Sequence, residues 1–147
     1  MTSSRTPQAV HLGSPTYSQT FPCEPSTAST GRMLVRGLLA LWRLSDLADR
    51  AGLVVTELIA NATRHTPCPE VRVIIRRPGA AWVRVGVVDR EPSRLPTLGP
   101  TCDEDESGRG LLLIDAVADR WGYDLHRRGR HPWCKEVWAE IHVSGDE

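Results

Sequence analysis

The segment SDLADRAGLVVTELIANATRH, residues 45–65, constrains the fold of this chain more than any other. Its apolar residues recur at helical spacing and form one face, which predicts an amphipathic helix. Ser45 or Asp46 can cap the beginning of this helix, and Pro67 and Pro69 end it. The apolar face of such a helix has to pack against another layer of the fold.

The segments around this helix complete an alternation of strands and helices. The expected elements are a strand at 16–21, a helix at 29–44, the helix at 45–65, hairpin strands at 70–77 and 81–89, a helix at 110–120, and strands at 121–128 and 136–143. The long polar segment between 90 and 110 is typical of a lid or binding loop. This order predicts an α+β fold, a two-layer α/β sandwich with a mixed, mostly antiparallel sheet and helices on one face.

The length of 147 residues indicates a single domain. Residues 1–15 are rich in Ser, Thr, Pro and Gly and predict a disordered N-terminal tail, so the domain is expected over residues 16–147. The four cysteines include no C-x-x-C pair, which argues against a zinc site and favours free thiols in a reducing cytoplasm.

Charge and hydropathy exclude several classes of partner. The formal net charge is +0, so no global basic field draws the chain to nucleic acid or to an anionic membrane. The N-terminus lacks the pattern of a signal peptide, and no apolar stretch reaches the roughly 18 residues of a membrane helix. A cytoplasmic protein without direct nucleic-acid or membrane contact is therefore expected.

Glu57 and Asn61 are two polar residues that interrupt the apolar pattern of the 45–65 helix. They are four residues apart, so their side chains lie above one another on one face, with Arg64 and His65 extending the same edge. A carboxylate can act as a general base, and an amide oxygen suits Mg²⁺. The same residues could also be the solvated edge of an ordinary helix.

Two later segments carry further candidate binding residues. Asp89 ends a strand, where it can accept a hydrogen bond from an exocyclic amine such as that of adenine, or simply form a turn. The sequence ESGRGLLLIDA, residues 106–116, places two glycines at the beginning of a helix, whose free N–H groups can bind an anion. Arg109 could reach a phosphate there, although a flexible loop with a helix cap explains the same residues.

Taken in order, these segments resemble the GHKL family of ATP-binding domains, which histidine kinases, Hsp90, gyrase and MutL share. More narrowly, the chain is similar to the small anti-sigma-factor serine kinases and their actinobacterial relatives. ELIANATRHT matches the N box of that family, VVDREPSRLP its first glycine box and ESGRGLLLIDAVADRWGY its second. The resemblance covers about residues 17–143 and implies the Bergerat (Hsp90-like) ATPase fold.

The resemblance implies a role for each matched position. Glu57 matches the carboxylate that acts as general base toward a serine hydroxyl of a partner protein. Asn61 matches the asparagine that binds Mg²⁺, and Asp89 matches the aspartate that reads adenine. Arg64 matches a position near the phosphates in some relatives. The lid and the helix after it would contact the nucleotide through Ser107, Gly108, Arg109, Gly110 and Leu111.

Two segments depart from the family pattern. The first glycine box normally reads D-x-G-x-G, whereas Asp89 is followed here by Arg-Glu-Pro-Ser, without either glycine. The late strand usually begins with Gly-Lys-Thr or Gly-Thr, whereas this chain reads Cys-Lys-Glu from Cys134 onward. Glu136 replaces a threonine that commonly supports adenine binding, so we expect adenine to be held more weakly.

The resemblance implies an ATP-binding regulatory protein, a serine/threonine protein kinase of the anti-sigma type. It would phosphorylate an anti-anti-sigma (STAS-type) antagonist and sequester a sigma factor, with ATP and Mg²⁺ as cofactors. A homodimer through the first strand and helix is expected. The first alternative is a non-catalytic partner-switching protein with weak or vestigial nucleotide binding, and the second is a structural domain without a ligand. Trp133, expected in a loop beside Pro132, is a candidate for a partner contact.

Overall fold

The computed structural model describes residues 15–65, 70–90 and 106–143. The predicted tail, apart from Pro15, and most of the long polar segment between 90 and 110 lie outside these residues. In chain order the elements are β1 (Thr16–Pro22), α1 (Thr27–Leu41), the short 3₁₀ helix η2 (Ser45–Leu47), α2 (Ala48–His65), β2 (Glu70–Gly79), β3 (Trp82–Asp89), α3 (Glu106–Val117), β4 (Arg120–Arg128) and β5 (His131–His142).

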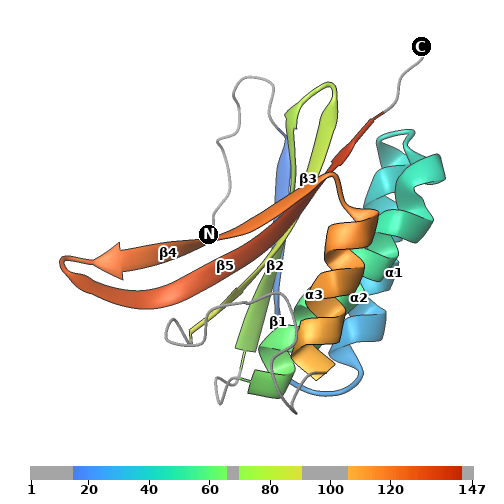
Figure 1. Cartoon of the computed structure of the whole chain (residues 1–147). Coiled ribbons are helices and arrows are strands. Elements are labelled where there is room, and N and C mark those ends of the chain that lie inside the picture. Colours follow the sequence, from blue (N-terminus) through green and yellow to red (C-terminus); the bar gives the residue numbers. More distant parts are fainter. Residues whose placement is uncertain (1–14, 66–69, 91–105, 144–147) are drawn as a thin grey trace.

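The strands form one five-stranded sheet in the order β1-β2-β3-β5-β4. All four pairings are antiparallel, so the sheet that was expected to be mixed is antiparallel throughout its described strands. Figure 1 shows the three α-helices together on one face of this sheet. The predicted two-layer α/β sandwich is thereby confirmed, and β4 forms one edge of it.

The core lies between the sheet and the helices because each strand presents alternate residues to them. On β3 the helix-facing residues are Val83, Val85 and Val87, all at most 1 % exposed. The two long helices pack closely at Gly31, where a methyl group would collide with the side chain of Ile59. A residue without a Cβ therefore lets α1 approach α2.

The end of α3 is held against α2 by Arg50. Its guanidinium donates to the carbonyl oxygen of Val117 at 2.7 and 3.2 Å and lies 3.3 Å from the carboxylate of Asp119. Asp119 also accepts a hydrogen bond from the backbone N–H of His142 at 2.7 Å. These contacts satisfy a terminal carbonyl of the helix and fix the position of α3 relative to α2 and β5.

Several element boundaries differ from the sequence-based predictions, above all those of the last helix and the last strand. The last helix begins at Glu106 rather than at residue 110 and ends at Val117 rather than at residue 120. The last strand begins at His131 rather than at residue 136, so Trp133 lies in β5 and not in a loop. Pro132 is tolerated there because β3 ends at Asp89, opposite Lys135, and beyond that point β5 pairs with β4 alone.

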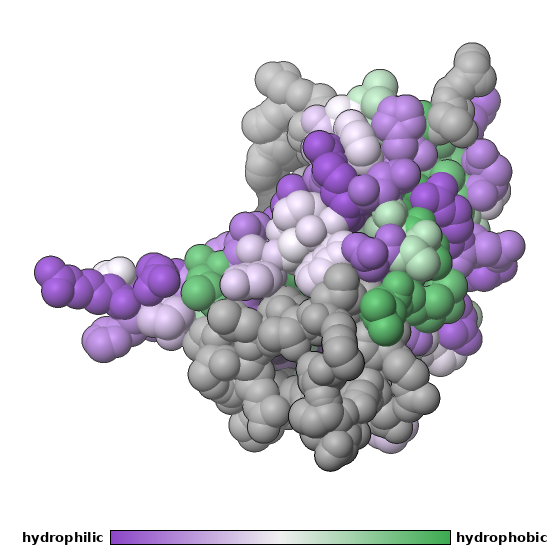
Figure 2. Space-filling view, viewed as in Figure 1, coloured by the Kyte–Doolittle hydropathy of each residue, from purple (hydrophilic) through white to green (hydrophobic). Residues whose placement is uncertain are grey.

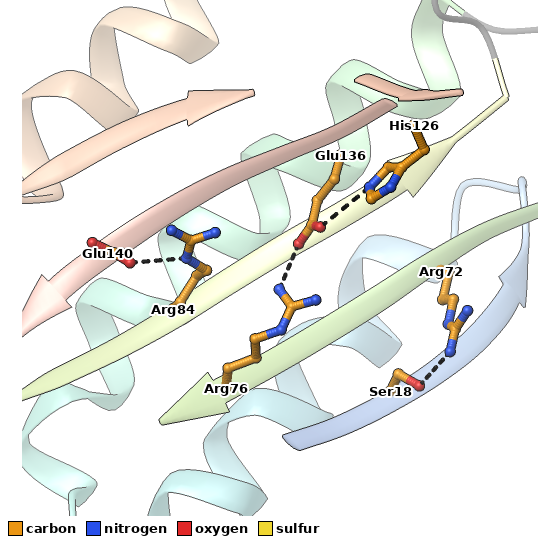
Figure 3. Close-up of polar contacts among 7 residues, drawn as sticks. All are labelled: Ser18, Arg72, Arg76, Arg84, His126, Glu136 and Glu140. Atoms are coloured by element: carbon orange, nitrogen blue, oxygen red, sulfur yellow. Dashed lines mark hydrogen bonds and ion pairs between the residues drawn. The ribbon is translucent and has the colours of Figure 1, made fainter. Parts of the chain in front are cut away.

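The face of the sheet opposite the helices carries a network of ion pairs (Figure 3). Glu136 accepts a hydrogen bond from Arg76 at 2.9 Å and lies 3.8 Å from the ring of His126. Glu140 pairs with Arg84 and Arg120, both at 2.8 Å. Both carboxylates are at most 5 % exposed, so these side chains bury each other on a face that none of the described helices covers.

Two observations bear on membranes and metals. Among the described residues, no helix is long and apolar enough to cross a membrane. The same residues contain no group of three or more His, Cys, Asp or Glu side chains arranged to hold a metal ion. Cys134 carries a free thiol.

Candidate functional site

Glu57 and Asn61 lie on one face of α2, at the border between core and surface. Both side chains are half-buried, whereas Val54 and Leu58 on the same helix are at most 2 % exposed. This border follows from helix geometry, because residues at i and i+4 share a face, whereas Leu58 and Ile59 point away from that face and into the core. Arg64 lies in the last turn of α2, and its side chain is outside what the structure describes.

Asp89, the last residue of β3, is 3 % exposed and forms an ion pair with Lys135. The Nζ atom of Lys135 lies 2.9 Å from Oδ1 of Asp89, and Lys135 itself is 5 % exposed. The register of the sheet pairs these two residues directly across β3 and β5. Removing two charges from water is costly, and the close pairing offsets that cost.

Lys135 is a residue of this site whose role the sequence-based reasoning missed. The strand alternation of β5 carried the signal, because Lys135 shares the helix-facing side with Val137, Ala139 and Ile141. A lysine on that buried side needs an anionic partner. Asp89, at the end of a neighbouring strand, is that partner.

Glu136, which stands at the threonine position of the family pattern, lies on the opposite side of the sheet. It is paired with Val88 in the register and hydrogen-bonded to Arg76 on the open face. Neighbouring residues of a strand point to opposite faces, so Glu136 and Lys135 cannot both face Asp89. The glutamate that replaces the threonine of the family pattern therefore adds a carboxylate to the open face. The charge beside Asp89 comes from Lys135.

The glycine-rich segment lies inside α3 rather than before it. Ser107, Gly108, Arg109, Gly110 and Leu111 are all helical, and their side chains are outside what the structure describes. The first N–H groups of a helix have no partner within the helix, and they suit an anion. The helix begins at Glu106, so these N–H groups belong to residues of the predicted segment.

The three candidate segments converge on one end of the molecule. Figure 1 shows the last turns of α2, the end of β3 and the first turn of α3 at the same end of the sandwich. Contacts of α2 with both α3 and β3 hold the segments in this arrangement. The fold thus brings together segments that are up to 50 residues apart in sequence, as the order of the three boxes predicts.

Cys134 adds a buried thiol next to this end of the sheet. Burial raises the pKa of Cys134 above its ordinary value, and the negative charge of Asp89 raises it further. The thiol is therefore protonated at neutral pH. It is a poor nucleophile there, and we assign it no catalytic role.

Comparison with known protein families decides what this arrangement is. The family model described as "Histidine kinase-like ATPase domain" matches residues 21–139. The chain belongs to the histidine kinase-like ATPase family. An uncharacterised protein of Streptomyces coelicolor is 44 % identical to it over 82 residues, which cover 55 % of this chain and 75 % of that relative. The predicted resemblance is confirmed, and membership of this family implies ATP binding, typically with Mg²⁺.

The residues on α2 fit a magnesium nucleotide better than the residue at the end of β3 does. The half-buried amide of Asn61 offers the kind of oxygen that Mg²⁺ prefers, and the half-buried carboxylate of Glu57 lies one turn away. Asp89 is buried at the end of β3, as an adenine-reading carboxylate should be, but its Oδ1 atom already accepts a hydrogen bond from Lys135. The α2 side of the site thus keeps the family pattern more closely than the β3 side does.

Proposed function

We propose that this protein is an ATP-binding regulator of the anti-sigma type and a serine/threonine protein kinase that phosphorylates an anti-anti-sigma antagonist. One observation carries the proposal: Glu57 and Asn61 share a half-buried face of α2, and the last turns of α2 lie at the end of the molecule where β3 ends and α3 begins. The family supplies ATP binding, and these residues supply groups suited to phosphoryl transfer.

Each residue has a separate task in the proposed reaction. Asn61 holds Mg²⁺ through its amide oxygen, and the bound ion neutralises charge on the phosphates. Glu57 is accessible to a partner because it is only half-buried, and its carboxylate accepts the proton of the attacking serine hydroxyl. The free N–H groups at the beginning of α3, which include those of Ser107 and Gly108, bind phosphate oxygens.

The proposal includes partners as well as chemistry. A sigma factor would be sequestered while the antagonist is phosphorylated, and two copies of the chain would associate through β1 and α1. Two apolar side chains on α1 support such a contact, because Met33 and Leu41 are 69 % and 75 % exposed. An exposed apolar surface of this kind gains stability when a partner covers it. We propose a cytoplasmic location.

The ion pair of Asp89 favours a second candidate function, a partner-switching protein without catalysis. Adenine recognition needs the carboxylate to accept a hydrogen bond from the exocyclic amine, and Lys135 competes for that carboxylate from 2.9 Å. If the competition prevents ATP from binding productively, the protein would act only through its partner contacts.

Phosphoryl transfer to an antagonist encoded beside this chain separates the two candidates. With labelled ATP and Mg²⁺, the wild-type chain should label the antagonist on serine. Glu57→Gln should lower the transfer rate by about 10²- to 10⁴-fold while the affinity for ATP is retained, because only proton transfer is lost. Asp49→Asn is the matched control, since Asp49 lies on the same helix with its side chain 92 % exposed.

Two results would contradict different parts of this proposal. Full transfer by Glu57→Gln would refute Glu57 as the base. ATP binding without transfer to the antagonist, in the wild-type chain, would favour the partner-switching protein.

A further inference from the structure

The β4–β5 hairpin projects from the sandwich as an arm, which we define as residues 126–134. The last pairing of β5 with β3 joins Lys135 to Asp89, so the arm is a two-stranded ribbon of β4 and β5 beyond that point. Figure 1 shows it extending past the layer of helices. Gly129, with a φ of 61°, closes the turn at its tip.

The arm is strongly basic, although the chain as a whole has a formal net charge of +0. Between Leu125 and Lys135 the sequence has no acidic residue, and the arginines and histidines of the arm are His126, Arg127, Arg128, Arg130 and His131. All five are exposed, and Figure 2 shows the projecting end as a hydrophilic surface. Among the described residues, the carboxylates beside the arm are those of Asp124, which is exposed, Glu136, which is buried and held by Arg76 (Figure 3), and Asp89, which is buried and paired with Lys135.

Trp133 stacks with two arginines, one in the arm and one at the end of β3. The guanidinium of Arg128 lies 4.4 Å from the ring centre of Trp133, and that of Arg90 lies 5.6 Å from it. Stacking holds a planar guanidinium by its face and leaves the N–H groups of its edge for a carboxylate. Trp133 is 37 % exposed, so this cluster is at the surface.

The outer edge of β4 is suited to pairing with another strand. Over the nine residues of β4, the structure describes no strand on that side, and most of its side chains are exposed. The opposite edge of the arm carries Pro132, which has no N–H to donate. Open edges of this kind accept extended peptides, whose main chain pairs with the edge while their side chains confer specificity.

We propose that the β4 edge of the arm binds an acidic, extended segment of a partner protein by strand addition. The main chain of that segment pairs with β4, and its carboxylates pair with the arginines of the arm. The charge of the arm selects an anionic partner. The unpaired strand edge favours a polypeptide over a nucleic acid, because a sugar–phosphate backbone cannot continue the sheet. This interaction does not depend on nucleotide binding.

A synthetic peptide tests the proposal on the full chain. The probe is an eight-residue peptide of alternating valine and glutamate, with binding measured by calorimetry and by amide hydrogen exchange. We expect saturable binding that weakens with added salt and slows the exchange of β4 amides. The double variant Arg127→Glu/Arg128→Glu should weaken binding at least tenfold. The matched control is Arg36→Glu/Arg43→Glu, which reverses two exposed charges near α1 and should bind as the wild type does.

A second probe separates strand addition from simple charge attraction. The same peptide with N-methylated backbone amides keeps its charges and cannot pair with β4, so it should bind at least tenfold more weakly. Equal binding of the methylated peptide would overturn the proposal. Tighter binding of an eight-nucleotide oligothymidylate than of the first peptide would also overturn it. An equal loss of peptide affinity in the Arg36→Glu/Arg43→Glu control, or no binding of the first peptide at millimolar concentration, would do the same. Melting temperatures of both double variants within a few degrees of the wild type would show that the variants are folded.

Discussion

The two faces of the sheet bury their carboxylates in different ways. On the open face Glu140 is paired with two arginines at 2.8 Å, and each of these arginines is partly exposed. On the helix-facing side Asp89 is paired with Lys135, and both side chains are at least 93 % buried. Glu140 would therefore keep one cation if it lost the other, whereas the carboxylate of Asp89 is held from 2.9 Å by a cation that is itself buried.

This difference separates a structural role from a functional one. The ion pairs of the open face connect β2, β3, β4 and β5, and Glu140 has two arginine partners. These pairs stabilise the sheet. The Asp89–Lys135 pair stands at the end of β3, where the resemblance to the family leads us to expect an adenine-reading aspartate. Removing these two charges from water is costly, and under the proposed function Asp89 belongs to the nucleotide site.

Lys135→Met should have the largest effect on stability. The substitution leaves the carboxylate of Asp89 buried beside an apolar side chain, so we expect unfolding free energy to fall by about 3–5 kcal/mol. Urea unfolding followed by fluorescence measures this loss. The double variant Lys135→Met/Asp89→Leu should recover most of it, because no charge is then left unpaired. A loss below about 1 kcal/mol in the single variant would show that the pair is not buried as described.

Glu140→Gln should have an intermediate effect. It leaves Arg84 and Arg120 without their carboxylate, although both can still be solvated because they are partly exposed. We expect a loss of about 1–3 kcal/mol in the same unfolding experiment, without any change in ATP affinity. A change in the affinity for ATP would show that the open face is coupled to the candidate site, and the two faces would then not act independently.

Arg120→Met should have a smaller effect because Glu140 keeps Arg84. The methionine can also remain packed on Trp82, over whose ring the Arg120 guanidinium lies at 4.0 Å. Unfolding free energy should fall by less than about 1 kcal/mol, in line with other partly exposed ion pairs. A loss as large as that of Lys135→Met would remove the contrast between a redundant network and a single pair.

Removing the charge of Asp89 should change the reactivity of the Cys134 thiol, and we expect this effect to be the smallest of the four. Burial, and then Asp89, raise the pKa of this thiol, so the reactive thiolate is scarce at pH 8 and increases only at higher pH. Asp89→Asn removes one of these causes and should lower the pKa, which speeds alkylation at pH 8. Peptide mass spectrometry measures the rate, with the half-buried Cys23 as the internal control. Equal rates in both proteins would show that Asp89 does not influence this thiol.

The periodicity of the sequence predicted most of the fold. The strand at 16–21, the hairpin and the amphipathic helix were all located because each has a clear apolar period and a proline or glycine at its boundary. The beginning of β5 was missed because Pro132 reads as a loop residue. Only the end of β3 at Asp89 shows why a proline is tolerated there.

The candidate site was predicted less completely than the fold. Glu57, Asn61 and Asp89 could be chosen by their spacing and family pattern, and the structure places the last turns of α2 and the end of β3 at one end of the molecule. The partner of Asp89 could not be chosen, because pairing Lys135 with it requires the register of β3 against β5. Register depends on the whole sheet and cannot be read from either strand alone.

A calorimetric titration of the full chain with ATP in the presence of Mg²⁺ tests the central claim most directly. The account predicts saturable binding of one ATP per chain, with an affinity that Asn61→Ala lowers about tenfold or more because the ion loses its amide ligand. Asp49→Asn, on the same helix, should bind as the wild type does. The absence of binding up to millimolar ATP, or equal affinity in wild type and Asn61→Ala, would contradict it.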